Sequence, residues 1–138
     1  MARAPQMIGV DTNVLLRFVV IEDIGESERA AAFFGARHAD DPAFVSIVVL
    51  VEFIWVLRSR YRFSQDRVVF VIESLMSSPA FVFEEQHHLS TLLRGSKVKA
   101  GDLADHLIAL SAARAGCSRT VTFDAAAASA IPLMELLA

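Results

Sequence analysis

The sequence contains a single cysteine, Cys117, among its 138 residues. One thiol can form neither an internal disulfide nor a cysteine-based zinc site, so we expect Cys117 to be a small core residue. Basic residues are also few, because 13 Lys and Arg stand against 16 Asp and Glu and give a net charge of −3. The chain therefore has no overall positive field that would attract nucleic acid, and a nucleic-acid enzyme would need a local basic patch.

Long uninterrupted apolar runs are missing as well. The richest stretch, residues 45–57, is interrupted by Glu52 and falls short of the roughly 18 apolar residues that a membrane span requires. The first residues lack the apolar core and the small-residue cleavage site of a signal peptide. We therefore expect a cytoplasmic protein without a membrane segment. The length and the hydrophobic content of 54% predict one globular domain, residues 1–138, with its own core.

Short apolar runs alternate along the chain with segments of helical periodicity. The runs predict strands at residues 7–10, 43–45, 80–83, 119–123 and 131–134. The first of these strands is expected to be buried on both faces. Helices are predicted between the strands. The alternation predicts an α/β fold in which helices cover both faces of a parallel sheet of about five strands.

Glu52 is the only charged residue in the apolar stretch 45–57. From Ser46 onward we interpret this stretch as a helix that is apolar nearly all round and therefore buried. A buried carboxylate is costly without a partner, and no Lys or Arg lies within the helical turn that precedes Glu52. Glu52 could sit at the rim of the helix, be protonated, or meet a partner from elsewhere in the fold, and the local sequence leaves these alternatives open.

Several aspartates follow predicted strands or begin predicted helices. Asp11 follows the first strand, Asp124 follows the fourth, and Asp105 lies in the first turn of a helix that Asp102 could cap. Because sites form at the carboxyl ends of parallel strands, these acids could converge with Glu52 and raise one another's pKa values. Mg²⁺ or Mn²⁺ would relieve the repulsion, since both ions prefer oxygen ligands. Helix capping alone is the ordinary alternative for such an aspartate.

Four segments in a fixed order carry a resemblance to a known family. They are I-G-V-D-T-N-V-L-L-R at 8–17, S-I-V-V-L-V-E-F-I-W-V-L at 46–57, G-D-L-A-D-H-L-I-A at 101–109, and V-T-F-D at 121–124. The chain resembles the PIN-domain ribonucleases, and most closely the VapC-like toxins of type II toxin–antitoxin pairs. The resemblance implies a three-layer α/β/α sandwich with a central, mostly parallel sheet. It also implies an endoribonuclease that hydrolyses RNA phosphodiester bonds with water activated by Mg²⁺ or Mn²⁺.

The resemblance further implies roles for individual residues. The acids that bind the metal and act in catalysis would be Asp11, Glu52, Asp105 and Asp124. Polar residues that support them would be Thr12, Asn13, Ser46, Asp102 and Thr122. The implied partners are an RNA substrate, a small cognate antitoxin that places a basic side chain in the acidic site, and a second copy of the chain in a homodimer or a larger complex.

Basic residues cluster in two places. They are Arg58, Arg60 and Arg62 after the apolar helix, and Lys97 and Lys99 before Asp102. These side chains could contact RNA phosphates, or they could be ordinary solvated residues near helix ends.

The sequence also allows functions other than that of a toxin ribonuclease. A PIN-type nuclease could instead act in RNA maturation or on structured DNA. A haloacid-dehalogenase-like Mg²⁺ phosphohydrolase would have a second Asp two residues after Asp11, where this chain has Asn13. A non-catalytic receiver-like signalling module would need a Lys at the end of a late strand, but Lys99 is the last Lys and precedes the fourth strand.

Overall fold

The structure is a computed structural model that describes residues 6–95 and 101–137. The chain divides into two compact units, an N-terminal unit of residues Met1–Gln86 and a C-terminal unit of residues His87–Ala138. Among the described residues, no helix has the length and apolar character needed to cross a bilayer.

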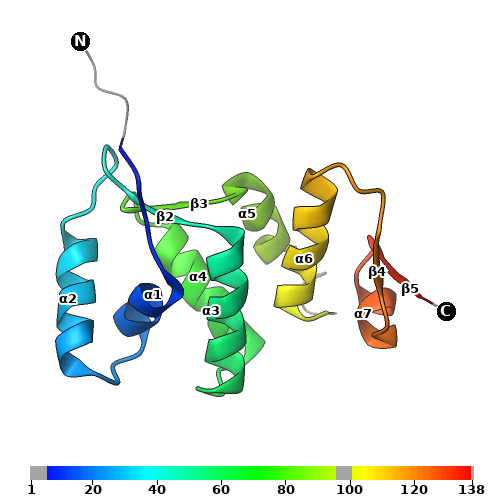
Figure 1. Ribbon diagram of the computed structural model, residues 1–138, viewed down its shortest axis with the longest axis horizontal. Coiled ribbons are helices and arrows are strands. Elements are labelled where there is room, and N and C mark those ends of the chain that lie inside the picture. The colour runs from blue at the N-terminus through cyan, green and yellow to red at the C-terminus, as the bar shows by residue number, and fades with distance from the viewer. Residues whose placement is uncertain (1–5, 96–100, 138) are drawn as a thin grey trace, which may run out of the picture. The chain divides into compact units, whose positions relative to one another are not determined.

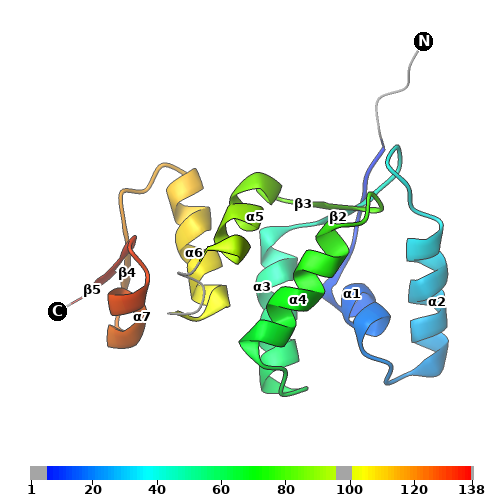
Figure 2. The same ribbon diagram turned by 180° about the vertical axis from the view of Figure 1, so that it is seen from behind.

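The N-terminal unit is built on a three-stranded parallel sheet in the order β1-β2-β3. Its elements are β1 (Ile8–Gly9), α1 (Thr12–Val19), α2 (Ile24–Gly35), β2 (Ala43–Val45), α3 (Ile47–Ser59), α4 (Gln65–Met76) and β3 (Phe81–Phe83). Ala43 of β2 is in register with Ile8 of β1 on one side and with Phe81 of β3 on the other. Two helices connect each pair of strands, since parallel strands need a long crossover. Figures 1 and 2 show α3 and α4 on the same side of the sheet.

Large side chains fill the core of the N-terminal unit. Leu15 of α1, Phe53 of α3 and Val68 of α4 are each fully buried. A row of aromatic rings adds to this core, because Phe34 lies 4.7 Å from Phe18 and 5.0 Å from Phe81 between ring centroids. Each buried side chain of this size contributes about 1.5–3 kcal/mol. The core therefore fixes the helices that begin where the strands end.

Helix α3 is buried on one face only. Ser46 caps it by accepting a hydrogen bond from the Val49 N–H at 3.2 Å, so the predicted helix start is confirmed. The prediction of burial all round is wrong, because Val48 and Trp55 are 80% and 66% exposed and Glu52 between them is also exposed. These positions are four and three residues apart and therefore share one side of the helix.

Strand β1 also differs from its prediction. It consists only of Ile8 and Gly9, and both residues are exposed. The expectation of a strand buried on both faces is therefore wrong. The physical reason is its place in the sheet of this unit, where β1 is an edge strand that pairs with β2 alone.

The C-terminal unit contains a second parallel sheet of two strands. Its elements are α5 (Gln86–Arg94, which starts at the last residue of the N-terminal unit), α6 (Leu103–Arg114), β4 (Thr120–Thr122), α7 (Ala125–Ala130) and β5 (Met134–Leu136). Its buried cluster joins Ala109 of α6 to Ala127, Ile131 and Met134. None of these four side chains is aromatic, in contrast to the row of rings in the core of the other unit.

The predicted α/β class, with parallel strands alternating with helices, is confirmed. The described part of the chain contains five strands, the expected number, but they form two sheets, one in each unit, where a single sheet was predicted. Two smaller predictions in the C-terminal unit are wrong. The last strand starts at Met134 because Pro132 and Leu133 form a turn, and Cys117 is exposed because it lies in the loop after α6.

Candidate functional site

Asp11 stands between the end of β1 and the start of α1. Its backbone is extended, and its Oδ1 accepts a hydrogen bond from the Thr12 N–H at 2.8 Å, which makes it the N-cap of α1. Thr12 is buried, whereas Asp11 and Asn13 are exposed. The capping bond uses only one carboxylate oxygen, and it fixes the direction of the exposed carboxyl group. The predicted position of Asp11 after the first strand is therefore confirmed.

Glu52 lies on the exposed side of α3, and the start of that helix is held by two side chains. Besides Ser46, Glu84 accepts a hydrogen bond from the Ile47 N–H through Oε1 at 3.1 Å. Sequence reasoning missed Glu84. It directly follows β3, so the signal that singled out Asp11 and Asp124, an acid after a strand, would have found it.

Two aspartates begin α6 in the C-terminal unit. Asp102 caps the helix, and its Oδ1 accepts hydrogen bonds from the N–H groups of Ala104 at 2.9 Å and Asp105 at 3.3 Å. Partial burial raises the pKa of Asp105 above its usual value, and the negative charges of Asp102 and Asp124 raise it further, while His106 opposes them. Asp105 is thus a carboxylate whose negative charge is only partly compensated.

Asp124 links the end of β4 to the start of α7. Its Oδ1 accepts from the Ala127 N–H at 3.1 Å, and its own N–H donates to Oγ1 of Thr122 at 3.0 Å. Thr122 therefore fixes the backbone that carries this acid. Asp124 is exposed, yet it lies near enough to Asp105 for its charge to act on the pKa of that carboxyl group.

The predicted acids are divided between the two units. Asp11 and Glu52 belong to the N-terminal unit, and Asp105 and Asp124 belong to the C-terminal unit. Within residues 6–95 and 101–137, no three His, Cys, Asp or Glu side chains are arranged to hold a metal ion. The donor chemistry nevertheless fits a hard divalent cation, since all four side chains offer carboxylate oxygens. Burial is the main cause of the raised pKa of Asp105, and the charges of Asp102 and Asp124, which a cation would offset, add to it.

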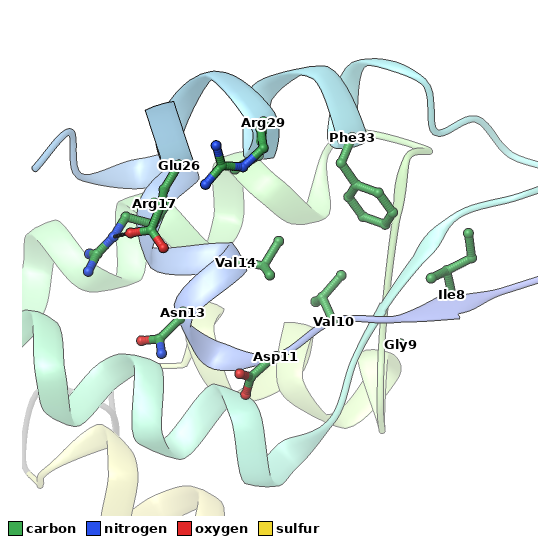
Figure 3. A pocket seen from close by; sticks show the side chains of 11 residues that line it. Ile8, Gly9, Val10, Asp11, Asn13, Val14, Arg17, Glu26, Arg29 and Phe33 are labelled. Atoms are coloured by element: carbon green, nitrogen blue, oxygen red, sulfur yellow. Dashed lines mark hydrogen bonds and ion pairs between the residues drawn. The ribbon is translucent and has the colours of Figure 1, made fainter. Parts of the chain in front are cut away.

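A pocket of about 500 Å³ lies beside Asp11 in the N-terminal unit. Figure 3 shows Val10 and Val14 facing Arg29 and Phe33 of α2, whereas the carboxyl group of Asp11 turns away from α2. The lining is mostly apolar. Arg17, which also lines the pocket, has its charge compensated by an ion pair with Glu26 at 3.0 Å and another with Glu22 at 3.4 Å.

The predicted RNA-binding residues have different surroundings. Arg60 forms an ion pair with Oε1 of Glu22 at 2.9 Å and its guanidinium lies 5.5 Å from the centre of the Tyr61 ring. Arg58 is partly buried, and Arg62 is exposed with a positive φ of 58°. Lys97 and Lys99 fall outside the described residues. Sequence patterns do not reveal the partner of Arg60, because Glu22 is 38 positions away.

Glu22 is the centre of this ion-pair cluster. Its Oε2 accepts from the Tyr61 hydroxyl at 2.5 Å and from Arg17 at 3.4 Å, while Oε1 accepts from Arg60. The Tyr61 hydrogen bond, followed by the positive charges of Arg60 and Arg17, lowers the pKa of Glu22 below its usual value. The cluster ties the loop between α1 and α2 to the end of α3.

Comparison with protein families supplies the class of the chain. The PIN-domain model matches residues 8–130, a range that includes all four predicted acids and residues of both units. The chain therefore belongs to the PIN-domain family. A search of curated proteins found no significant match. PIN domains are typically nucleases, and they generally use divalent metals, so nucleic acid is the substrate class that this family membership indicates.

Proposed function

We propose that this protein is a Mg²⁺- or Mn²⁺-dependent endoribonuclease in which residues 1–138 act as one nuclease domain. The observation that carries the proposal is the PIN-domain match over residues 8–130, which includes Asp11, Glu52, Asp105 and Asp124. These four acids are proposed to bind the metal. Three of them follow a strand or lie in the first turn of a helix, and the fourth projects from the exposed side of a rigid helix.

The residues of the chain are suited to hold and orient such an ion. A bound divalent cation lowers the pKa of water and polarises a phosphodiester. Capping bonds to backbone N–H groups restrict the carboxyl groups of Asp11 and Asp124 to defined directions. Supporting groups of this kind typically contribute 10–100-fold to metal affinity or activity. Thr12, Asn13, Ser46, Asp102 and Thr122 are proposed as this supporting set.

RNA contacts are proposed for the basic residues near the ends of helices. Arg58 and Arg62 are candidates for phosphate binding, together with Lys97 and Lys99. The ion pair with Glu22 already offsets the charge of Arg60, so its contribution is expected to be smaller. Because the net charge of the chain is −3, binding depends on such local groups.

The biological role proposed is that of the toxin subunit of a VapBC-type toxin–antitoxin pair. The support is the resemblance of the four ordered segments to VapC-like toxins. A small antitoxin would neutralise the nuclease by placing a basic side chain among the acids, which their negative charge favours. The toxin is further proposed to form a homodimer. The second candidate is a PIN-type nuclease that acts in RNA maturation or on structured DNA.

Cleavage assays with the purified full chain test the enzymatic proposal. We expect the wild-type protein to cleave RNA in Mg²⁺ or Mn²⁺, to leave structured DNA intact, and to lose activity in a chelator. Glu52→Gln should lose activity, whereas Glu73→Gln, which changes an exposed acid on α4, should retain it. RNase activity that survives the chelator would contradict the metal assignment, and cleavage of structured DNA alone would favour the second candidate.

Induced expression tests the toxin role separately. The wild-type protein and the Glu73→Gln control should arrest growth, and Glu52→Gln should not. Equal arrest by all three would show that growth inhibition does not depend on the proposed nuclease. An active nuclease that leaves growth unaffected would contradict the toxin role alone.

A further inference from the structure

Gly101, which directly precedes the α6 cap Asp102, occupies a position where a side chain would make three tight contacts. A Cβ at this residue would lie 3.0 Å from Nε2 of His106, 3.2 Å from Cβ of Ala130 and 3.2 Å from Cγ1 of Ile131. Optimal separations between carbon atoms are about 3.5–4.0 Å. The absence of a side chain therefore lets the start of α6 approach the end of α7 within the C-terminal unit.

The neighbours of Gly101 are packed, which limits how far they can shift. His106 is 6% exposed and Ile131 is 2% exposed. Ala130 packs against the buried cluster that contains Ala127 and Ile131. By comparison, a Cβ built on Gly35 at the end of α2 would meet nothing within 4 Å. The steric restriction is thus specific to the contact of Gly101 with His106, Ala130 and Ile131, which we call the Gly101 joint.

The two helices at the Gly101 joint each carry one proposed metal ligand. Asp105 is in the first turn of α6, four residues after Gly101, and Asp124 caps α7, which Ile131 closes. Asp105 belongs to α6 itself, and Asp124 is held to α7 by its capping bond. The separation between the two acids therefore depends on how α6 packs against α7, and that packing is set by the joint and by the cluster of Ala109, Ala127, Ile131 and Met134.

We propose that the Gly101 joint sets the separation of Asp105 and Asp124, so that Gly101 and His106 are positioning residues for metal binding. The inference rests on the proposed function, because it assumes that both acids bind the ion. An added methyl group at Gly101 would force a shift of a few tenths of an ångström between the start of α6 and the end of α7, and we expect this shift to change the separation of the two carboxylates. Neither Gly101 nor His106 needs to touch the ion in this arrangement.

The test compares Gly101→Ala with Gly35→Ala in the full chain. Mn²⁺ affinity is measured by calorimetry, RNA cleavage over a range of Mn²⁺ concentrations, and folding by circular dichroism. Gly101→Ala should remain folded, weaken Mn²⁺ binding by about 10–100-fold, and recover cleavage at high Mn²⁺. Gly35→Ala should bind Mn²⁺ as the wild-type protein does. Unchanged Mn²⁺ affinity in Gly101→Ala would overturn the joint and leave the proposed function intact.

A double variant tests the role of His106 itself. His106→Ala alone should weaken Mn²⁺ binding, and the loss in Gly101→Ala with His106→Ala should be smaller than the sum of the two single losses, because the new methyl group no longer meets the ring. Strictly additive losses would overturn the positioning role of His106. A wild-type protein that neither binds Mn²⁺ nor cleaves RNA would overturn the proposed function, and the joint with it.

Discussion

The two units present their acids in different electrostatic surroundings. In the N-terminal unit, Asp11 and Glu52 are exposed and project from helices that a core of large side chains holds in place. In the C-terminal unit, Asp105 is partly buried, and the charges of Asp102 and Asp124 raise its pKa. The difference indicates that the N-terminal unit holds its acids on rigid helices. The C-terminal unit instead brings negative charges together, and their repulsion opposes the folding of that unit.

A substitution in the core of the N-terminal unit should have the largest effect on stability. Phe53→Ala removes a fully buried ring of α3 and should reduce the free energy of unfolding by about 3–5 kcal/mol. Val48→Ala is the matched control on the exposed side of the same helix, and its effect should stay within about 0.5 kcal/mol. Denaturant unfolding measures both, and similar losses for the two variants would contradict the one-sided burial of α3.

Removal of an aspartate cap should have an intermediate effect on stability. Asp124→Ala removes the hydrogen bond to the Ala127 N–H and should destabilise α7 by about 1 kcal/mol. Asp124→Asn should restore most of that stability, because Asn is as good an N-cap as Asp, but it should not restore nuclease activity. Thermal unfolding and RNA cleavage separate the two roles. If Asn restored both, the negative charge of Asp124 would have no part in catalysis.

Neutralising Asp105 should have a small effect on stability, and this effect should be an increase. Asp105→Asn removes a negative charge three residues from Asp102 and should stabilise the protein at neutral pH by about 0.2–0.5 kcal/mol, while abolishing cleavage. The folded-state pKa of Asp105 is raised, so the native state holds this proton more tightly than the unfolded state does. Stability from this group is therefore present at low pH and is lost as pH rises through the raised pKa.

The gain in stability from Asp105→Asn should accordingly grow as pH rises through the raised pKa of Asp105. It should vanish below the ordinary aspartate pKa of 3.8. Melting temperatures of the two proteins from mildly acidic to neutral pH measure this change. A constant difference, or a less stable variant at neutral pH, would contradict the account of repulsion in the C-terminal unit.

Local signals in the sequence predicted the helix starts well. Ser46, Asp102 and Asp124 each precede a helical segment, and a short polar side chain there bonds to the first N–H groups, so the position follows from adjacent residues. The alternation of apolar runs and helices likewise predicted the α/β class. These features depend on interactions within a few residues, which a sequence displays directly.

Features that depend on tertiary packing were not predictable in this way. Val48 and Trp55 have the same apolar character as the buried residues of α3, so no pattern distinguishes the exposed side from the core. Arg60 finds its partner in Glu22, which is distant in sequence, and the steric role of Gly101 depends on residues 131 and 106. The roles of the four acids rest on the family match, since local patterns explain their capping bonds equally well.

The most direct measurement is Mg²⁺-dependent RNA cleavage by Asp11→Asn and Asp105→Asn, with Glu73→Gln as the control. Asn at position 11 can still cap α1, so the first variant removes charge without removing the helix cap. The account predicts that each aspartate variant, one from each unit, loses cleavage by about 100-fold or more while remaining folded, and that Glu73→Gln cleaves at the wild-type rate. A wild-type rate in either aspartate variant would contradict it.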